Sequence, residues 1–322
     1  MDFPPPTVLE GLDLTAIREA ISPHFNKTTF LSSERLDAEL GAKITIASES
    51  FQHTGSFKLR AALSVALHAT ESHLVTASSG NFGAALARAA KLAGKKCTVV
   101  MPASSSKVKI AQVKSYDAAV DLIDPTKVSR AARLAELAAS IPDARSCSPY
   151  DDAYVIAGNA TLGHEIFSAL DPDVVVAPVG GGGLSSGIVV ARDDAKAKAV
   201  VVGAEPAIAN DAARSLRAKK RIANEQEPQT IADGARTLSL GEKNFAILER
   251  GMQGVVEVPE ARIREAVRAL FSILHLQVEP TGALAVAAVM TNPAEFSGKR
   301  VVCVVSGANV EPALYASILT TS

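Results

Sequence analysis

Short runs of β-branched apolar residues alternate with alanine-rich stretches along most of this chain. Runs of this length, without strict alternation, are typical of strands buried on both faces of a sheet. They are His73–Thr76, Cys97–Met101, Ala119–Ile123, Val174–Pro178, Ala199–Ala204 and Arg300–Val305. The stretches between them with helical apolar spacing are Ala84–Leu92, Val108–Ser115, Val128–Ser140, Leu184–Ala191 and Ala261–Leu274. The alternation predicts parallel α/β sheets with helices on both faces.

The length of 322 residues favours two domains. No internal repeat or long linker separates them. The proline and aspartate cluster Ser148–Asp152 is the best candidate for a chain crossing between domains. The polar stretch Lys219–Gln229 is expected to be a surface excursion.

Composition and charge exclude several classes of protein. Hydrophobic residues make up 48% and charged residues 21%, as in a soluble globular protein. The net charge of -1 offers no electrostatic basis for binding nucleic acid or an anionic membrane. No apolar run is long enough to span a bilayer, and no secretory signal is visible. Cys97 and Cys303 lie in strand-like runs and are expected to be buried in a reducing compartment, which favours the cytoplasm.

Candidate chemistry begins with Thr54–Arg60, which follows the strand-like run Lys43–Ser48. This segment places Lys58 just inside a new helix. Unpaired N–H groups and the positive end of the helix dipole favour the uncharged amine that imine chemistry needs. Taken alone, the segment is explained as well by a solvated, inert lysine.

A second segment, Ala77–Gly83, joins a strand to an alanine-rich helix. Its hydroxyls, its amide and the N–H groups at the helix start would suit a carboxylate ligand. The alternative is that Ser79 or Asn81 only caps the helix.

The third segment, Val179–Gly187, contains four consecutive glycines directly after a strand. Such a loop allows successive N–H groups to turn toward one phosphate, with the dipole of the following helix behind them. It is not a Walker A loop, because no Lys-Ser/Thr pair follows, and it does not satisfy the dinucleotide fingerprint.

The fourth segment, Val304–Asn309, ends the last strand-like run. A single hydroxyl there, on Ser306, suits a hydrogen bond to a ring nitrogen. By itself the segment would be an ordinary turn.

Together and in this order, the four segments resemble the fold type II pyridoxal-phosphate enzymes, most closely the serine/threonine dehydratase and serine racemase family. The resemblance runs from about Ile17 to Val310. It implies the tryptophan synthase β-like fold, with two open twisted parallel-sheet α/β domains and the active site between them. The small substrate-side domain would span residues 72–149, and the large cofactor-binding domain would combine residues 1–71 and 150–322.

The resemblance also implies roles for individual residues. Lys58 would hold pyridoxal 5′-phosphate as an imine and act as the catalytic base, and Ser79 would act on the opposite face of the substrate. The implied cofactor-binding residues are Phe57, Lys58, Asn81, Gly180, Gly181, Gly182, Gly183, Leu184 and Ser306. The implied substrate-binding residues are Ser78, Ser79, Asn81 and Phe82. Many relatives carry His at the position of Phe82, Gln at Asn159 and Gly at Ala160.

Glu205, the carbonyl of Ala209 and Asp211 match the family's divalent-cation site. Oxygen ligands of this kind suit Mg²⁺ or Ca²⁺. The alternative is that Glu205 ends a strand and Asp211 caps a helix.

The activity implied by the resemblance is elimination of water from a β-hydroxy amino acid, of serine, threonine or 3-hydroxyaspartate type, to give a keto acid and ammonia. A homodimer is expected. The chain ends soon after Ser306, which favours an unregulated catabolic role. Three alternatives stay open: an amino-acid racemase, a β-replacement synthase of the cysteine synthase type, and a phosphate-binding module without catalysis.

Overall fold

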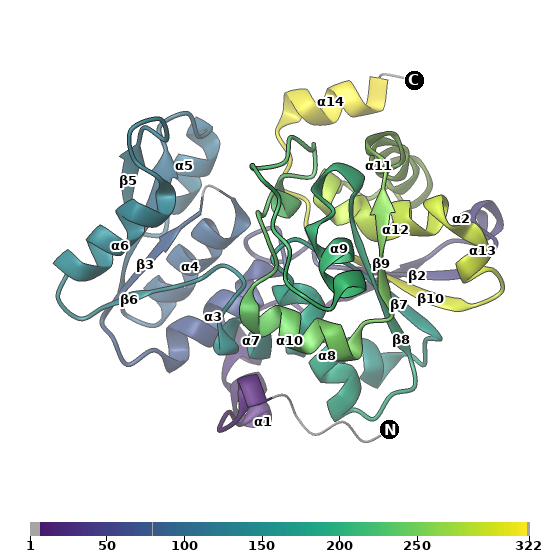
Figure 1. The fold of residues 1–322 in the computed structure, drawn as a ribbon, viewed down its shortest axis with the longest axis horizontal. Coiled ribbons are helices and arrows are strands. Elements are labelled where there is room, and N and C mark those ends of the chain that lie inside the picture. Colours follow the sequence, from purple (N-terminus) through teal and green to yellow (C-terminus); the bar gives the residue numbers. More distant parts are fainter. Residues whose placement is uncertain (1–6, 79, 321–322) are drawn as a thin grey trace.

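The computed structural model describes residues 7–78 and 80–320 and contains two α/β domains, each built on its own sheet (Figure 1). The six-stranded sheet has the order β1-β2-β10-β7-β8-β9, and the four-stranded sheet has the order β5-β4-β3-β6. The strands are β1 (Thr29–Ser32), β2 (Lys43–Ser48), β3 (His73–Ala77), β4 (Lys96–Pro102), β5 (Ala119–Ile123), β6 (Ala144–Ser146), β7 (Val174–Pro178), β8 (Val200–Pro206), β9 (Gly254–Val258) and β10 (Arg300–Val305). The predicted fold class is confirmed.

All neighbouring strands pair in parallel except β1, which is antiparallel to β2 at the edge of the larger sheet. The predicted strands are present with ends that differ by at most two residues, whereas β1, β6 and β9 were not predicted. These three lie at sheet edges, and β6 and β9 carry few fully buried residues, so their apolar signal in the sequence is weak.

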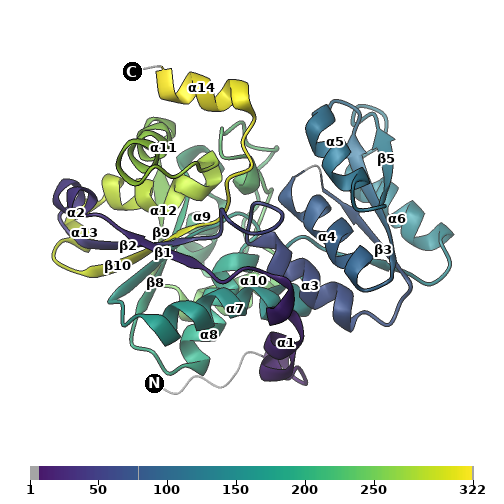
Figure 2. The same ribbon diagram turned by 180° about the vertical axis from the view of Figure 1, so that it is seen from behind.

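Helices cover both faces of the sheets (Figures 1 and 2). They are α1 (Leu14–Ile21), α2 (Glu34–Leu40), α3 (Lys58–His68), α4 (Asn81–Leu92), α5 (Lys107–Lys114), α6 (Arg130–Ser140), α7 (Ala153–Ala169), α8 (Gly183–Asp194), α9 (Asp211–Ala218), α10 (Glu242–Gly251), α11 (Glu260–Leu274), α12 (Pro280–Thr291), α13 (Pro293–Phe296) and α14 (Pro312–Thr320). Four short 3-10 helices are η1 (Thr7–Leu9), η2 (Ser22–His24), η3 (Ala207–Ala209) and η4 (Asp233–Ala235).

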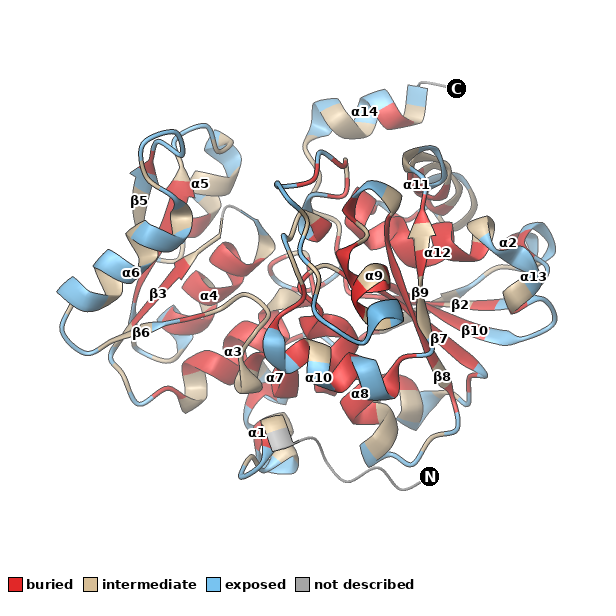
Figure 3. Ribbon diagram, in the orientation of Figure 1, coloured by how far each residue is buried: buried red, intermediate tan, exposed pale blue. Residues whose placement is uncertain are grey.

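The larger sheet is buried on both faces because its side chains alternate between two apolar clusters. Val174 and Val176 of β7 join the cluster of α11 and α12, whereas Val175 and Ala177 join that of α7 and α8. All five residues of β7 are therefore buried, as the central strands and α12 are in Figure 3. This rigid sheet presents the carboxyl ends of β2, β7 and β10 at one edge.

The helices that pack on the smaller sheet bury fewer of their residues than those on the larger sheet. Its apolar cluster includes α3 and α4, whereas α6 buries none of its residues (Figure 3). Helix α3 packs between the domains, against α4 on one side and α7 on the other. The lysine-bearing helix therefore contacts both halves of the molecule.

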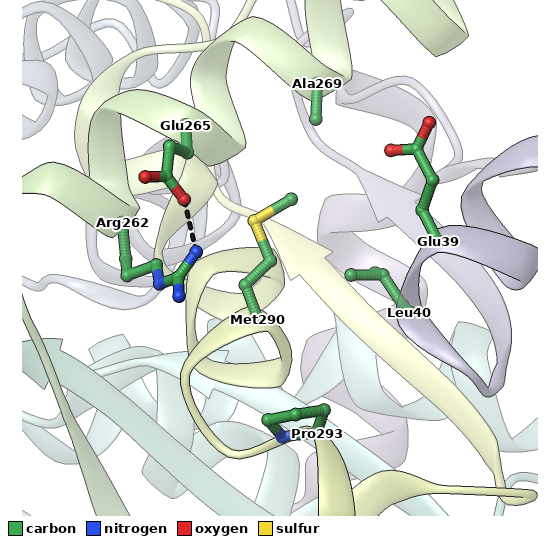
Figure 4. Close-up of a pocket in the computed structure, with 7 residues that line it drawn as sticks. All are labelled: Glu39, Leu40, Arg262, Glu265, Ala269, Met290 and Pro293. Atoms are coloured by element: carbon green, nitrogen blue, oxygen red, sulfur yellow. Dashed lines mark hydrogen bonds and ion pairs between the residues drawn. The ribbon is translucent and has the colours of Figure 1, made fainter.

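Cys97, Cys147 and Cys303 are free and buried, as predicted for the two that lie in strands. Within residues 7–78 and 80–320, none of the helices combines the length and the hydropathy that crossing a membrane requires. A surface groove of about 350 Å³ lies between α2, α11, α12 and α13 (Figure 4). It is lined by Glu39, Leu40, Arg262, Glu265, Ala269, Met290 and Pro293, none of them a predicted site residue.

Candidate active site

The segment that carries Lys58 is attached to the end of β10. A bridge pairs Ser56 with Gly307, and the N–H of Phe57 donates to the carbonyl oxygen of Ser306 over 3.0 Å. Lys58 is then the first residue of α3. Two of the predicted segments, about 250 residues apart in sequence, are thus in direct backbone contact.

Lys58 lies between two aromatic rings and a carbonyl group. Its Nζ donates to the carbonyl oxygen of Pro149 at 2.7 Å and lies 4.9 Å from the ring centroid of Phe57 and 5.9 Å from that of Phe82. Burial lowers the pKa of Lys58 to about 8, although the Glu279 carboxylate acts in the opposite direction. Roughly a tenth of the amine is then uncharged at pH 7, which suits nucleophilic attack on a carbonyl carbon.

Ser306 carries a buried hydroxyl group without a hydrogen-bond partner in the described part of the chain, as expected of a residue that binds a ligand. It is 1% exposed, and its Oγ has no hydrogen-bond partner among the described residues. A buried hydroxyl without a partner costs free energy, so such a group in a native site calls for a bound ligand or an ordered water. A neutral ring nitrogen would satisfy it.

The glycine loop, Gly180–Gly183, runs from the end of β7 into α8. Gly182 has a φ of 93°, which other residues rarely adopt, and a Cβ on Gly181 would lie 2.3 Å from the ring of Tyr150. Asn244, which lies on α10, holds the loop in place, since its Nδ2 donates to the carbonyl oxygen of Gly181 over 2.8 Å. The loop therefore meets the start of α8, where first-turn N–H groups are available to a phosphate.

The loop after β3 faces this edge from the smaller sheet. Asn81 begins α4, and its Nδ2 lies 3.0 and 3.1 Å from the two carboxyl oxygens of Glu279. Ser78 precedes it, with its Oγ accepting from the N–H of Gly80 over 3.3 Å. Phe82 is buried in the apolar cluster of the smaller sheet. The predicted residue Ser79 lies outside the described part of the chain.

Lys58, Asn81, the glycine loop and Ser306 are thus joined by contacts between their neighbours. Pro149 accepts from Lys58 while the adjacent Tyr150 packs on Gly181. The residues fit pyridoxal 5′-phosphate: an amine of lowered pKa, an unpartnered hydroxyl and a glycine loop packed so tightly against Tyr150 that a side chain on Gly181 would not fit.

The predicted cation ligands lie elsewhere, at the end of β8 and the start of α9. The Glu205 carboxyl accepts from the N–H groups of Ala212 and Ala213 at 3.2 and 2.7 Å, and Asp211 Oδ1 accepts from Asn224 over 2.9 Å. Burial raises the pKa of Glu205 to about 9 and that of Asp211 to about 7. Ala209 lies between them in η3.

These contacts favour neither explanation of the acids outright. Glu205 binds the first turn of α9, as a structural role requires, but Asp211 Oδ2 is buried without a partner in the described residues. Within those residues, no cluster of three or more His, Cys, Asp or Glu side chains is arranged to hold a metal. The cation site stays a prediction.

Several residues of the site were not assigned roles from the sequence. Glu279 and Asn309 both contact Asn81, and Tyr150 and Asn244 pack on the glycine loop. Asn309 belongs to the segment Val304–Asn309 described above, whereas Glu279 lies in none of the four segments. Their function depends on contacts between distant parts of the chain, which spacing alone does not reveal.

Comparisons with known proteins agree with this geometry. Residues 21–307 match the family described as "Pyridoxal-phosphate dependent enzyme". The beta-hydroxyaspartate dehydratase of Paracoccus denitrificans is 33% identical over 304 residues, which cover 93% of this chain and 96% of that protein. The serine racemase of Schizosaccharomyces pombe is 32% identical and covers 96% of each.

Among solved structures, the processed form of threonine deaminase isoform 2 from Solanum lycopersicum superposes with a TM-score of 0.89 at 27% identity. The match covers 96% of this chain and 92% of that one. The similar proteins thus carry names of both dehydratases and racemases.

Proposed function

This chain belongs to the pyridoxal-phosphate-dependent enzymes, and we propose that it eliminates water from a small β-hydroxy amino acid to give a keto acid and ammonia. The observation that carries the proposal is the half-buried Lys58, with a pKa of about 8, attached through Phe57 to the unpartnered hydroxyl of Ser306. Relatives named for 3-hydroxyaspartate and a solved threonine deaminase support substrates of the 3-hydroxyaspartate and threonine types, and a relative named serine racemase supports the serine type.

When bound, the cofactor withdraws electrons from the substrate and so allows it to lose its α-proton and then its β-hydroxyl. Lys58 would hold the cofactor, and its amine, once free, would take the α-proton. The first turn of α8 and the glycine loop would bind the phosphate, and Asn81 would donate to the ring hydroxyl. The N–H groups at the start of α4 and the Ser78 hydroxyl would bind the substrate carboxylate.

The identity of Ser306 bears on the type of reaction. A neutral hydroxyl offers the ring nitrogen no charge to stabilise a proton there. The bound ring would then withdraw electrons less strongly, and loss of the β-substituent would be favoured over return of the α-proton. Ser306 therefore favours elimination.

Racemisation is the second candidate, because relatives named serine racemase match over nearly the whole chain. It would need a proton donor on the face opposite Lys58, and Ser79 is the residue we propose for that position. A β-replacement synthase shares the architecture and would consume an added thiol. A binding module without catalysis would have no use for the Lys58 amine.

We also propose the organisation of the whole protein. The four strands between His73 and Ser146 form one sheet and the flanking strands form the other, which supports the domain limits 72–149. A cytoplasmic homodimer is in keeping with the family resemblance and with three free cysteines. Gel filtration with light scattering tests the oligomeric state.

The decisive change is Lys58→Ala. We expect it to abolish keto-acid release and the absorbance near ~410–420 nm of the bound cofactor, because no other amine would hold the imine. The far-ultraviolet circular dichroism spectrum, which reports secondary structure, should stay unchanged. Borohydride reduction and peptide mass mapping of the unaltered protein should place the cofactor on Lys58, and an adduct on another lysine would contradict the assignment.

Ser79→Ala separates the two candidate activities. We expect any racemisation to fall by more than a factor of ~10², the scale of a lost acid–base group, whereas elimination should fall less. Chiral chromatography of the remaining amino acid, run beside a keto-acid assay over serine, threonine and 3-hydroxyaspartate, measures both. Equal losses of the two activities would make Ser79 a positioning residue and remove the support for a racemase.

A further inference from the structure

The amide of Asn81 is held at both ends by side chains from the larger domain. Its Oδ1 accepts from Asn309 Nδ2 over 2.8 Å, and its Nδ2 donates to the Glu279 carboxyl over 3.0 Å. Asn309 Nδ2 also donates to the carbonyl oxygen of Thr54 over 2.8 Å. Four residues from separate parts of the chain therefore form one hydrogen-bonded path, Thr54–Asn309–Asn81–Glu279.

The direction of every bond in this path follows from its first member. The carbonyl oxygen of Thr54 can only accept, so the Asn309 atom facing it is the nitrogen. The second hydrogen of that nitrogen points to Asn81, and the Asn81 atom there must be the oxygen. The Asn81 nitrogen consequently faces the Glu279 carboxyl, which offers an accepting oxygen even when burial, which raises its pKa to about 8, keeps it protonated. The orientation of the Asn81 amide, usually ambiguous between oxygen and nitrogen, is thereby determined.

The path leaves Asn81 with one uncommitted N–H. The two Glu279 oxygens lie 3.0 and 3.1 Å from the Asn81 nitrogen and, as members of one carboxyl group, on the same side of it. The two hydrogens of an amide nitrogen point about 120° apart, so this carboxyl engages one of them. Without Asn309, the amide could rotate by 180° and present its oxygen to Glu279 and to the ligand side. A carbonyl oxygen in that place could not donate a hydrogen bond to the ring oxygen of the cofactor.

Close packing around Asn309 and Glu279 restricts the positions of their side chains. A Cβ on Gly55 would lie 2.3 Å from Asn309 Oδ1, and Gly55 has a φ of 73°. A Cβ on Gly307 would lie 3.0 Å from Glu279 Oε1, and the N–H of Glu279 donates to the carbonyl oxygen of Gly307 over 3.1 Å. Glu279 itself is 3% exposed. Two glycines thus leave just the space that the two polar side chains occupy.

We propose that Asn309 and Glu279 are positioning residues that hold the Asn81 amide with its free N–H directed at the ring hydroxyl of the cofactor. The inference rests on the proposed pyridoxal-phosphate chemistry. It assigns these residues a role through Asn81, with no contact of their own to the reacting atoms.

The test measures the dissociation constant of pyridoxal 5′-phosphate by titrating the apoprotein. We expect Asn309→Ala to weaken binding about tenfold, the effect of one hydrogen bond, and Asn292→Ala on the surface to leave it unchanged. In an Asn81→Ala background, Asn309→Ala should change the constant less than about twofold. The analogue 3-deoxypyridoxal 5′-phosphate, which lacks the ring hydroxyl, should bind the unaltered protein and Asn309→Ala equally.

Glu279 provides a second, independent measurement. Glu279→Gln keeps an accepting oxygen for Asn81 and should bind the cofactor within about threefold of the unaltered protein, whereas Glu279→Ala should lose about tenfold. The melting temperature of each apoprotein reports folding separately from binding.

Each outcome has a definite meaning. A tenfold loss in Asn309→Ala that persists with the deoxy analogue or without Asn81 would overturn the inference, because a general disturbance of the site would then explain it. Equal losses in Glu279→Gln and Glu279→Ala would overturn the role of Glu279 as an acceptor. If the unaltered protein binds no pyridoxal 5′-phosphate, the proposed function fails and this inference fails with it.

Discussion

Two clusters of buried carboxyl groups in the larger domain differ in how their charge is balanced. In the first, the Arg60 cluster, Glu49 and Glu165 surround the guanidinium of Arg60 on α3. In the second, the acid pair, Glu205 and Asp211 lie at the end of β8 and the start of α9. Neither member of the acid pair forms an ion pair within residues 7–78 and 80–320.

The Arg60 cluster supplies its own cation. Arg60 Nε lies 2.7 Å from Glu49 Oε2, and Arg60 Nη2 lies 2.9 Å from Glu165 Oε2. Thr28 donates its hydroxyl to Glu49 and accepts from Arg60, and the guanidinium lies 4.1 Å from the ring centroid of Phe25. Arg60 and its partners join α3 to α7 and to the segment before β1. Arg60 lies two residues after Lys58, the proposed catalytic lysine.

Among the described residues, the donors hydrogen-bonded to the acid pair are neutral, and the nearby charge of Arg214 does not offset the effect of burial on Asp211. Backbone N–H groups bind Glu205 and the Asn224 amide binds Asp211, and the pKa of both acids is raised by burial. The Arg60 cluster therefore carries its own counter-charge, whereas the raised pKa values show that the acid pair is stabilised by a proton, and we propose that a divalent cation could take the place of that proton. We therefore expect mutation of the Arg60 cluster to lower the stability of the folded protein. We expect the contribution of the acid pair to that stability to change with pH and with added metal.

The largest expected effect comes from breaking the Arg60 cluster. Arg60→Met keeps the volume of the side chain but leaves Glu49, fully buried, without its counter-charge. Removing one partner of a buried ion pair typically costs about 3–5 kcal/mol. We expect chemical denaturation to show a loss of that size in the free energy of unfolding.

The matched control is Arg300→Met, which removes an exposed arginine paired with Asp171 and Asp173. Exposed pairs contribute at most about 1 kcal/mol, so its unfolding free energy should change little. Adding Glu49→Gln to Arg60→Met should recover part of the lost stability. Losses of equal size at Arg60 and Arg300 would contradict the view that the first cluster is a completed ion pair.

Those parts of the fold with a local signal were predictable from the sequence. The buried strand Val174–Pro178 begins with three consecutive valines, and Arg300–Val305 is similarly rich in valine. Ser306 was proposed as a site residue because it directly follows the second of these strands. Helix α12 was not predicted because it is apolar around its whole circumference and therefore shows no helical period. The edge strand β1 was missed because none of its residues is buried.

The polar contacts of the site could not be read from the sequence for a different reason. Glu279 and Asn81 are 198 positions apart, and Arg60 and Glu165 are 105 apart. Neither pair has a spacing that predicts contact, since the fold alone brings them together. The motif around Lys58 is the basis for proposing that lysine, whereas the ion pairs of Arg60, two residues later, are visible only in the fold.

The acid pair should give a smaller effect that depends on pH. The pKa of Glu205 and that of Asp211 are about 9 and about 7 in the folded protein, above the ordinary values of acids in the unfolded chain. The folded protein therefore holds protons that the unfolded chain releases above about pH 4, so stability is highest in acid and falls as the pH rises through 7 and 9. Each group contributes about 1.4 kcal/mol per pH unit within its window.

A divalent cation should replace the missing proton, so its effect should grow as the pH rises. At a free concentration of about 100 times its dissociation constant, Mg²⁺ or Ca²⁺ would stabilise the folded state by about 2.7 kcal/mol. We expect the rise in melting temperature on adding the cation to be larger at pH 9 than at pH 6, and to vanish in Glu205→Gln and Asp211→Asn. Both variants should also flatten the fall of stability with pH, whereas Glu249→Gln on the exposed face of α10 should preserve it. The contradicting outcome is a melting temperature that falls with rising pH but does not change at pH 9 when cation or chelator is added. In that case the acid pair binds a proton as a structural element and does not bind a cation.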